Sequence, residues 1–141
     1  MDILQTVKDS WGWTGIIPVE VVTENDFANL ILKDKNDKFW RLCPEDVYCE
    51  VIADSIDAYN KLINDQEFVN DWFMDPIVAE AKTALGEPEE GHKYCLIVSG
   101  ILDGDYTADN IKTAPMEEII TASGELGKKV KGLPNGAKIE L

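Results

Sequence analysis

Apolar and polar residues alternate along Phe27–Ala53, and this period of two predicts three consecutive strands. The segments FANLILKD and KFWRLC are joined by a polar tip, Lys35–Asp37, which suits a hairpin turn. After Pro44 comes VYCEVIA, whose β-branched and aromatic residues favour a pleated, half-buried surface. We expect this meander to form the centre of the sheet.

The same alternation assigns the side chains of the middle strand to two faces. Trp40 and Leu42 share one face, whereas Phe39, Arg41 and Cys43 share the other. We therefore predict that Trp40 is a structural residue that packs into the core.

Further elements are predicted on both sides of the meander. A helix over Asp2–Ser10 leads to Trp11 and Trp13, which we expect to close the edge of the core, and a strand begins at Pro18. After Ala53 the apolar period becomes that of a helix. Helices are expected after caps at Ser55, Asn64 and Asp75, with a stop at Gly86, and from Pro115 to a bend or end at Ser123–Gly124.

Late segments complete the predicted fold. YCLIVSGIL has the length and flanks of a strand buried on both faces, LDGDYTADN is a loop dense in turn-forming residues, and AKIEL is an expected edge strand. Strands come first, helices follow, and a strand pair returns late. This order predicts an α+β fold, with an antiparallel or mixed central sheet of about five or six strands and helices packed against it. We expect a single domain over residues 1–141.

Acidic side chains dominate the composition, with a formal net charge of −14 and an isoelectric point of about 4.3. Such a surface repels nucleic acid and anionic lipid and speeds association with basic partners. Between Cys43 and Glu90 there are 13 acidic residues against only Lys61 and Lys82, a local charge of −11. A face of this kind either keeps the protein in solution or takes the place of phosphates in the cationic groove of a nuclease or nucleotide-handling enzyme.

The cysteines and the N-terminus indicate a reducing compartment. Cys43, Cys49 and Cys95 are odd in number, none forms a C-x-x-C pair, and each lies in an apolar run. The start of the chain has no signal-peptide pattern, and no apolar stretch approaches the roughly 18 residues that would span a bilayer. We expect a cytoplasmic protein that binds neither membrane nor nucleic acid.

Sites for metals, cofactors and catalysis are not predicted. The loop with Asp103, Asp105 and Asp109 departs from the EF-hand pattern, which needs further oxygen ligands, a glycine and a bidentate glutamate where this loop has Thr107, Ala108 and Ala114. His92 is the single histidine, which excludes zinc sites built on several imidazoles. Its proximity in sequence to Cys95 does not define a nucleophile–base pair, and no phosphate-binding or nucleophile-elbow motif is present.

Several segments resemble a bacterial family: FWRLCPED, GILDGDYTADNI with the helix that follows it, and LPNG, within a similarity that extends from about Pro18 to the end. This is the C-terminal domain family of type VI secretion immunity proteins, which protect against DNase effectors. The resemblance implies a non-catalytic cytoplasmic protein that binds and blocks a toxin made beside it. Better-known members carry this domain behind another N-terminal domain, whereas only a short helix precedes it here, so the target toxin stays open.

The charge pattern then suggests candidate contact residues for such a toxin. They are acidic residues in the two loops that flank YCLIVSGIL: Glu87, Glu89 and Glu90 in one, and Asp103, Asp105 and Asp109 in the other. We expect one interface to use one loop, accompanied by an aromatic or aliphatic anchor. Two other classes stay open, namely an adaptor or structural module of a secretion system and a small enzyme with unrecognised carboxylate chemistry.

Overall fold

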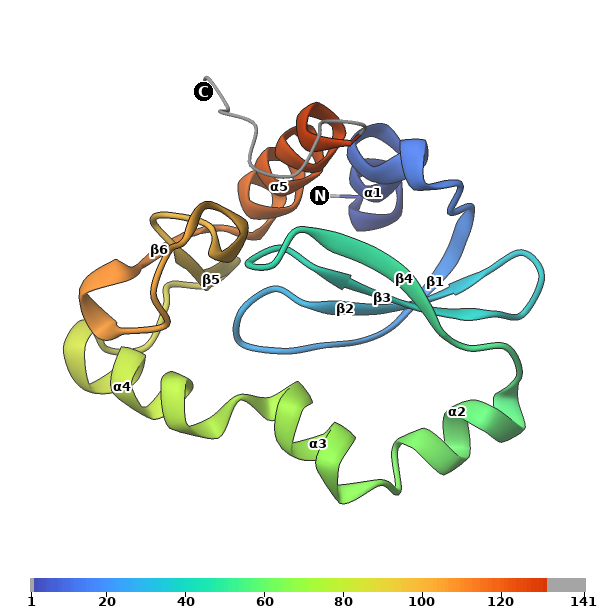
Figure 1. The fold of residues 1–141 in the computed structure, drawn as a ribbon, viewed down its shortest axis with the longest axis horizontal. Helices are drawn as coiled ribbons and strands as arrows, with labels where there is room; N and C mark the ends of the chain where they lie inside the picture. The colour runs from blue at the N-terminus through green and yellow to red at the C-terminus, as the bar shows by residue number, and fades with distance from the viewer. Residues whose placement is uncertain (1, 132–141) are drawn as a thin grey trace.

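The computed structural model describes residues 2–131, so the predicted edge strand AKIEL lies outside the described residues. The chain forms an α+β fold (Figure 1). Its elements are α1 Ile3–Trp11, η1 Gly12–Thr14, β1 Pro18–Glu24, β2 Leu30–Asp34, β3 Phe39–Cys43, β4 Tyr48–Ala53, α2 Ile56–Leu62, α3 Gln66–Phe73, α4 Asp75–Leu85, β5 His92–Leu96, η2 Gly100–Leu102, η3 Ala108–Asn110, β6 Ile111–Pro115 and α5 Met116–Val130. Among these described elements, no helix combines the length and apolar composition needed to cross a membrane.

The central sheet is an antiparallel meander in the order β1-β2-β3-β4, which confirms the three strands predicted between Phe27 and Ala53. Within residues 2–131 this sheet has four strands, fewer than the five or six expected. Helices α2, α3 and α4 carry the chain along the sheet to its far end, where β5 pairs with β6 as a separate two-stranded sheet (Figure 1). The backbone bond from Tyr94 N to Asp26 O, 3.0 Å, ties that small sheet to the β1–β2 connection.

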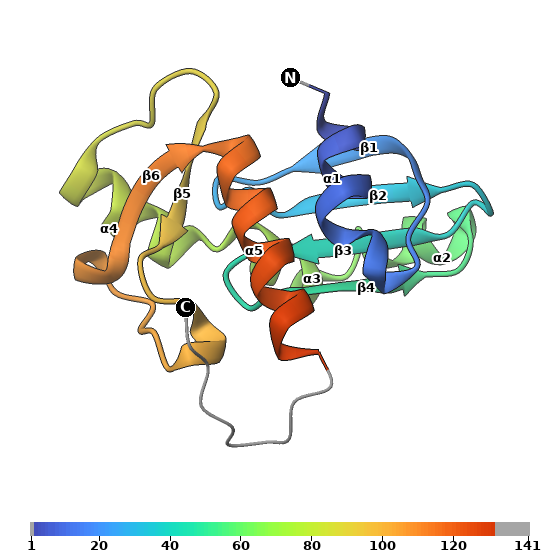
Figure 2. The ribbon, with the colours of Figure 1, turned by 90° about the horizontal axis from the view of Figure 1, so that it is seen from above.

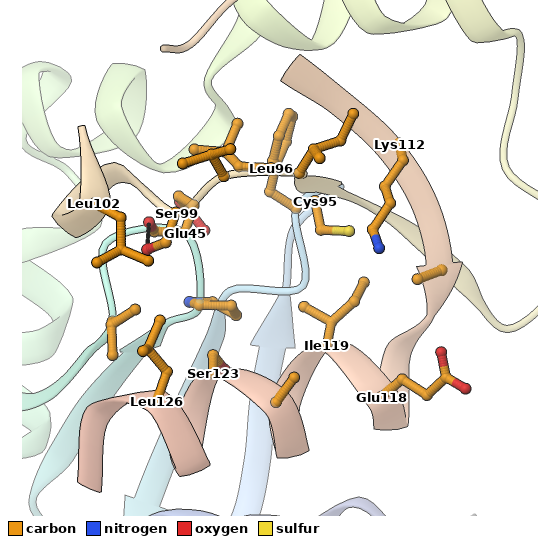
Figure 3. A pocket seen from close by; sticks show the side chains of 17 residues that line it. Glu45, Cys95, Leu96, Ser99, Leu102, Lys112, Glu118, Ile119, Ser123 and Leu126 are labelled. Atoms are coloured by element: carbon orange, nitrogen blue, oxygen red, sulfur yellow. Dashed lines mark hydrogen bonds between the residues drawn. The ribbon is translucent and has the colours of Figure 1, made fainter. Parts of the chain in front are cut away.

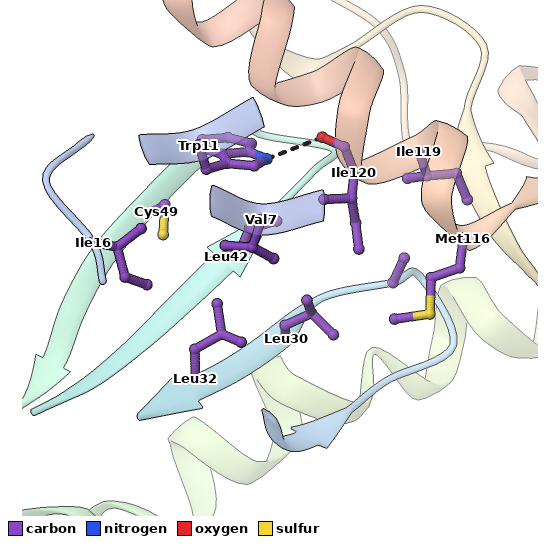
Figure 4. Close-up of a cluster of buried hydrophobic side chains, with 11 residues drawn as sticks. Val7, Trp11, Ile16, Leu30, Leu32, Leu42, Cys49, Met116, Ile119 and Ile120 are labelled. Atoms are coloured by element: carbon purple, nitrogen blue, oxygen red, sulfur yellow. Dashed lines mark hydrogen bonds between the residues drawn. The ribbon is translucent and has the colours of Figure 1, made fainter. Parts of the chain in front are cut away.

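Both faces of the meander are covered, because its side chains alternate as predicted. On one face Leu30, Leu32 and Leu42 pack against α1 and α5, where the indole N–H of Trp11 donates to the Ile120 carbonyl at 3.0 Å (Figure 4). On the other face Ile31, Phe39 and Ala53 pack against Tyr59 of α2 and Trp72 of α3. A third cluster joins α4 to β5 and β6 through Phe27, Val78, Ala81, Tyr94, Leu96 and Ile111.

The predicted N-cap is confirmed for α2 and is wrong for α3 and α4. Ser55 caps α2 as predicted, and its side chain accepts from the Ala58 N–H. Asp65, rather than Asn64, caps α3, because its carboxylate reaches the N–H groups of Glu67 and Phe68. Asp75 is the first residue of α4 rather than its cap; the preceding Met74 has a left-handed backbone that separates α3 from α4.

A helix end at Ser123–Gly124, one of the two expected outcomes, is also wrong, since α5 continues to Val130. Gly124 and Gly127 face α1 and the residues after it. A Cβ at Gly124 would overlap the Ser10 carbonyl oxygen, and one at Gly127 would lie 2.7 Å from the Trp13 ring. These glycines allow the close approach of two helices rather than ending one of them.

The strand predicted over YCLIVSGIL is shorter than expected and is not buried on both faces. β5 ends at Leu96. The Ile97 N–H still donates to the Asn110 carbonyl, 2.8 Å, but the Val98 N–H donates to the Asn110 side chain instead of a strand, and the η2 turn follows. The strand β6, which sequence analysis did not predict, pairs with β5 from Ile111 to Pro115.

Candidate functional site

The six predicted contact residues, Glu87, Glu89, Glu90, Asp103, Asp105 and Asp109, are all exposed. They lie in two loops at opposite ends of β5, as the sequence indicates (Figure 2). The structure therefore does not bring the two groups together. The loop after β5, residues 97–110, differs from the loop before it in how its backbone is held, and it is called the 97–110 loop below.

The 97–110 loop is attached to the turn between β3 and β4. The Ser99 hydroxyl and the Gly100 N–H both donate to the Glu45 carbonyl, at 3.1 and 2.9 Å. The Tyr106 hydroxyl donates to the Asp46 carboxylate. Burial, and then the hydrogen bond with Asp46, raise the pKa of Tyr106, so the phenol keeps its proton and stays a donor.

Asn110 closes the same loop from inside. Its amide donates to the carbonyls of Val98 at 3.0 Å and Asp105 at 2.8 Å, and its side-chain oxygen accepts from the Val98 N–H at 2.9 Å. Gly104 packs so closely on Val98 that a Cβ there would overlap the Val98 carbonyl. The loop is thus built in one conformation by its own side chains and glycines.

Large apolar side chains project from this loop into solvent. Ile97, Val98, Ile101 and Tyr106 are 55, 44, 40 and 39% exposed. They are interspersed with the carboxylates of Asp103 and Asp105. Apolar side chains held out on a fixed loop and surrounded by charge are typical of protein-binding surfaces.

A cavity of about 330 Å³ opens beside the exposed apolar side chains (Figure 3). Its walls come from α5, from β5 and β6, and from the β3–β4 turn. Apolar side chains make up most of it, including Phe27, Val47, Leu96, Leu102, Ile119 and Leu126. Lys112 and Glu118 are the charged side chains on the β6 and α5 walls (Figure 3).

A buried polar network supports the β3–β4 turn from below. Asn29 donates to both carboxylate oxygens of Glu45, at 3.0 and 2.8 Å, and accepts from Arg41 Nε at 3.1 Å. Arg41 also pairs with the exposed Asp71 and lies over the Trp72 ring at 5.1 Å. Burial raises the pKa of Glu45, and the Asn29 hydrogen bonds only partly offset this.

Sequence analysis missed Glu45, Asn29 and Tyr106 as residues that build the site. A signal was present for one of them: FWRLCPED places Arg41 and Glu45 in or beside an apolar strand, and buried charges need partners. Nothing in the local sequence indicates that Tyr106 bonds to a residue 60 positions away.

The described residues show little that favours catalysis or metal binding. Among residues 2–131 no group of three His, Cys, Asp or Glu side chains gathers closely enough to hold an ion. Cys43, Cys49 and Cys95 are free thiols. Burial raises the pKa of Cys95, and it raises the pKa of Cys49 to about 12, which opposes the thiolate form that a nucleophile requires.

Comparison with known proteins gives the family. No curated protein sequence matches the chain. The family described as T6SS immunity protein Tdi1, C-terminal, matches residues 53–127, more than half of the chain. The match includes the 97–110 loop, the small sheet and most of α5. The chain belongs to this family of type VI secretion immunity proteins.

Proposed function

We propose that this protein binds a cognate type VI secretion toxin in the cytoplasm and neutralises it by covering the toxin's cationic active site, without catalysis of its own. The observation that carries the proposal is the 97–110 loop. It displays exposed apolar side chains and three carboxylates on a backbone fixed by hydrogen bonds.

Charge complementarity supports this mode of inhibition. A toxin that acts on DNA or nucleotides must present basic residues to phosphates, and an acidic protein surface attracts the same groove. The net charge of −14 favours such an encounter. Protection inside a cell requires tight binding, and nanomolar affinity corresponds to about −12 kcal/mol. Apolar contacts from Ile97, Val98 and Ile101 supply the part of the binding free energy that charge alone does not provide.

Of the two acidic loops, the 97–110 loop is the better candidate. Glu87 of the other loop lies 3.5 Å from Lys82, which neutralises part of its charge locally. In contrast, no ion pair involves Asp103, Asp105 or Asp109 within residues 2–131. Exposed apolar side chains also lie in the 97–110 loop with Asp103, Asp105 and Asp109. Near the glutamates of the other loop, Leu85 is the exposed large apolar side chain among the described residues.

Co-expression in a bacterial host with the toxin encoded beside this gene tests the proposal. Two matched triple variants carry the same charge change: Asp103→Lys/Asp105→Lys/Asp109→Lys and Glu87→Lys/Glu89→Lys/Glu90→Lys. We expect the wild type and the glutamate variant to rescue growth and the aspartate variant to fail.

The outcomes separate the parts of the proposal. Rescue by both variants would show that the acidic loops are not the means of inhibition, although an immunity role would stand. If the wild type neither rescues growth nor forms a complex with the toxin, the function itself is wrong.

A further inference from the structure

We propose that the cavity between α5, the small sheet and the β3–β4 turn is a preformed receptacle for one large apolar side chain of the toxin, presented from a basic segment. This inference rests on the proposed function and deepens it, because it names the part of the surface that anchors the partner.

The cavity is continuous with the exposed apolar surface of the 97–110 loop. Its floor is made by side chains that belong to the core, such as Phe27, Leu96 and Ile119, which are buried. Its rim includes Ile97 and Val98, which also line the cavity but are exposed to solvent. An apolar group entering here would therefore pass from one apolar surface to another without crossing a polar barrier.

The walls are rigid, so the cavity stays open in the free protein. Val47 has φ 53°, a left-handed conformation that a β-branched residue adopts only when its surroundings impose it. The bonds from Ser99 and Gly100 to Glu45 hold the loop against that turn. On the other side α5 is fixed by its close packing at Gly127, where a Cβ would lie 2.9 Å from Val47.

The buried polar groups of the cavity are already satisfied, and its charged lining residues Lys112 and Glu118 are exposed to solvent. Among the described residues, no buried side-chain nitrogen or oxygen lacks a hydrogen-bond partner. Glu45 bonds to Asn29, and the Ser123 hydroxyl donates to the Ile120 carbonyl at 3.1 Å. The buried floor of the cavity therefore offers few unmet donors or acceptors to a polar small molecule, whereas an apolar side chain needs none.

The size and charge of the surroundings favour a basic protein as the occupant. A cavity of about 330 Å³ lies at the lower end of the range of about 300–1,000 Å³ for ligand pockets, which suits a side chain rather than a long segment. Asp103 and Asp105 lie in the loop that forms one wall. With a net charge of −14, a second copy of this chain and an anionic lipid surface are both repelled.

Filling the cavity tests the inference. Ala122, an exposed residue of α5 that lines it, is replaced in Ala122→Trp; the control is Ala79→Trp, at an exposed position of α4 outside the cavity. Both are measured by calorimetry against the toxin encoded beside this gene, and by thermal unfolding. We expect Ala122→Trp to weaken binding by at least about 30-fold, the effect of losing one hot-spot contact, with an unchanged melting temperature. Ala79→Trp should bind like the wild type.

A second measurement uses the wild type and needs no variant. The Cys95 thiol points into the cavity (Figure 3), whereas Cys43 and Cys49 are buried elsewhere. Because burial raises the pKa of the Cys95 thiol, labelling of the free protein with maleimide is slow and is followed over hours at about pH 8.5. Labelling of Cys95, located by mass spectrometry, should slow at least about tenfold further when the toxin is bound. This measurement decides the question if Ala122→Trp unfolds the protein.

The failures of the two proposals are distinguishable. If the wild type binds the toxin while Cys95 labelling is unchanged, or if a folded Ala122→Trp binds like the wild type, the receptacle is wrong and the immunity function stands. If the wild type does not bind the toxin, the proposed function is wrong and the receptacle inference falls with it.

Discussion

The Tyr106 hydroxyl donates a hydrogen bond to the Asp46 carboxylate, which joins the 97–110 loop to the β3–β4 turn across 60 positions of sequence. In the same turn the Glu45 carbonyl accepts hydrogen bonds from the Ser99 hydroxyl and the Gly100 N–H. Two segments distant in sequence are therefore held together by hydrogen bonds within the chain itself.

Removing this link should loosen the loop without unfolding the protein. Tyr106→Phe keeps the ring and deletes the donor, so we expect a loss of about 0.5–1.5 kcal/mol in the free energy of unfolding by urea. Hydrogen exchange of amides in residues 99–106 should become faster, and toxin binding should weaken. Unchanged exchange in this loop would show that the backbone bonds to Glu45 suffice to hold it.

Gly124 of α5 gives a prediction that a second glycine, outside α5, can control. Gly124→Ala adds a Cβ that overlaps the Ser10 carbonyl, so α1 and α5 must move apart. We expect a loss of about 1–3 kcal/mol in the free energy of unfolding, the usual cost of overpacking.

The control is Gly12→Ala, where the added Cβ would meet nothing within 4 Å and the backbone is right-handed. It should leave the protein as stable as the wild type or stabilise it by about 0.4–1 kcal/mol. Equal effects at the two glycines in urea unfolding would contradict the close packing described for Gly124.

Trp40 is half-buried rather than enclosed. It packs against the cluster beneath α1 and α5, and its indole N–H donates to Asp34 Oδ2 at 2.8 Å. Trp40→Ala should therefore cost about 3 kcal/mol, the lower limit for truncating a core tryptophan. Trp40→Phe, which keeps an aromatic ring and loses only the donor, should cost clearly less. A melting temperature unchanged by Trp40→Ala would show that the side chain is not structural.

The buried Glu45 predicts a pH dependence of stability. Its pKa in the folded protein is raised above the ordinary value of 4.5, so the folded state binds more protons than the unfolded state just above that pH. The contribution of Glu45 is fully present below its unfolded pKa and is lost as the pH rises through the folded pKa. The free energy of unfolding of the wild type, relative to Glu45→Gln, should thus fall with increasing pH.

Urea unfolding between about pH 4.5 and pH 7 measures this difference. Glu20→Gln, at an exposed position of β1, also removes one negative charge and so reports the general effect of a less negative protein. If the free energy of unfolding of the wild type rises with pH relative to that of Glu45→Gln, the Asn29 hydrogen bonds outweigh burial.

Much of the fold was predictable because local patterns and tertiary packing agree. The alternation around Trp40 and Leu42 predicted the meander and its two faces. The α5 glycines could not be interpreted from sequence, because a glycine that ends a helix and one that admits a neighbouring helix have the same local pattern.

The candidate site shows the same limit. The sequence identified the acidic residues of both loops but not which loop is the better candidate. The apolar run through Ile97 and Val98 predicted a buried strand, because a buried strand and an exposed apolar loop have the same local pattern. Only the bonds of Asn110, which turn this run out of the sheet, distinguish the two.

The core shared by α1 and α5 has a consequence for how this protein can evolve. One cluster combines Val7, Trp11 and Leu30 with Met116 and Ile120, although the family match begins only at residue 53. A gene exchange that replaced residues 53–127 alone would transfer the proposed toxin-binding loop but only three of the eleven buried side chains of this core, namely Met116, Ile119 and Ile120. New specificities are therefore expected to arise by point substitution on the loop, or by exchange of both parts together, rather than by transfer of the family segment alone.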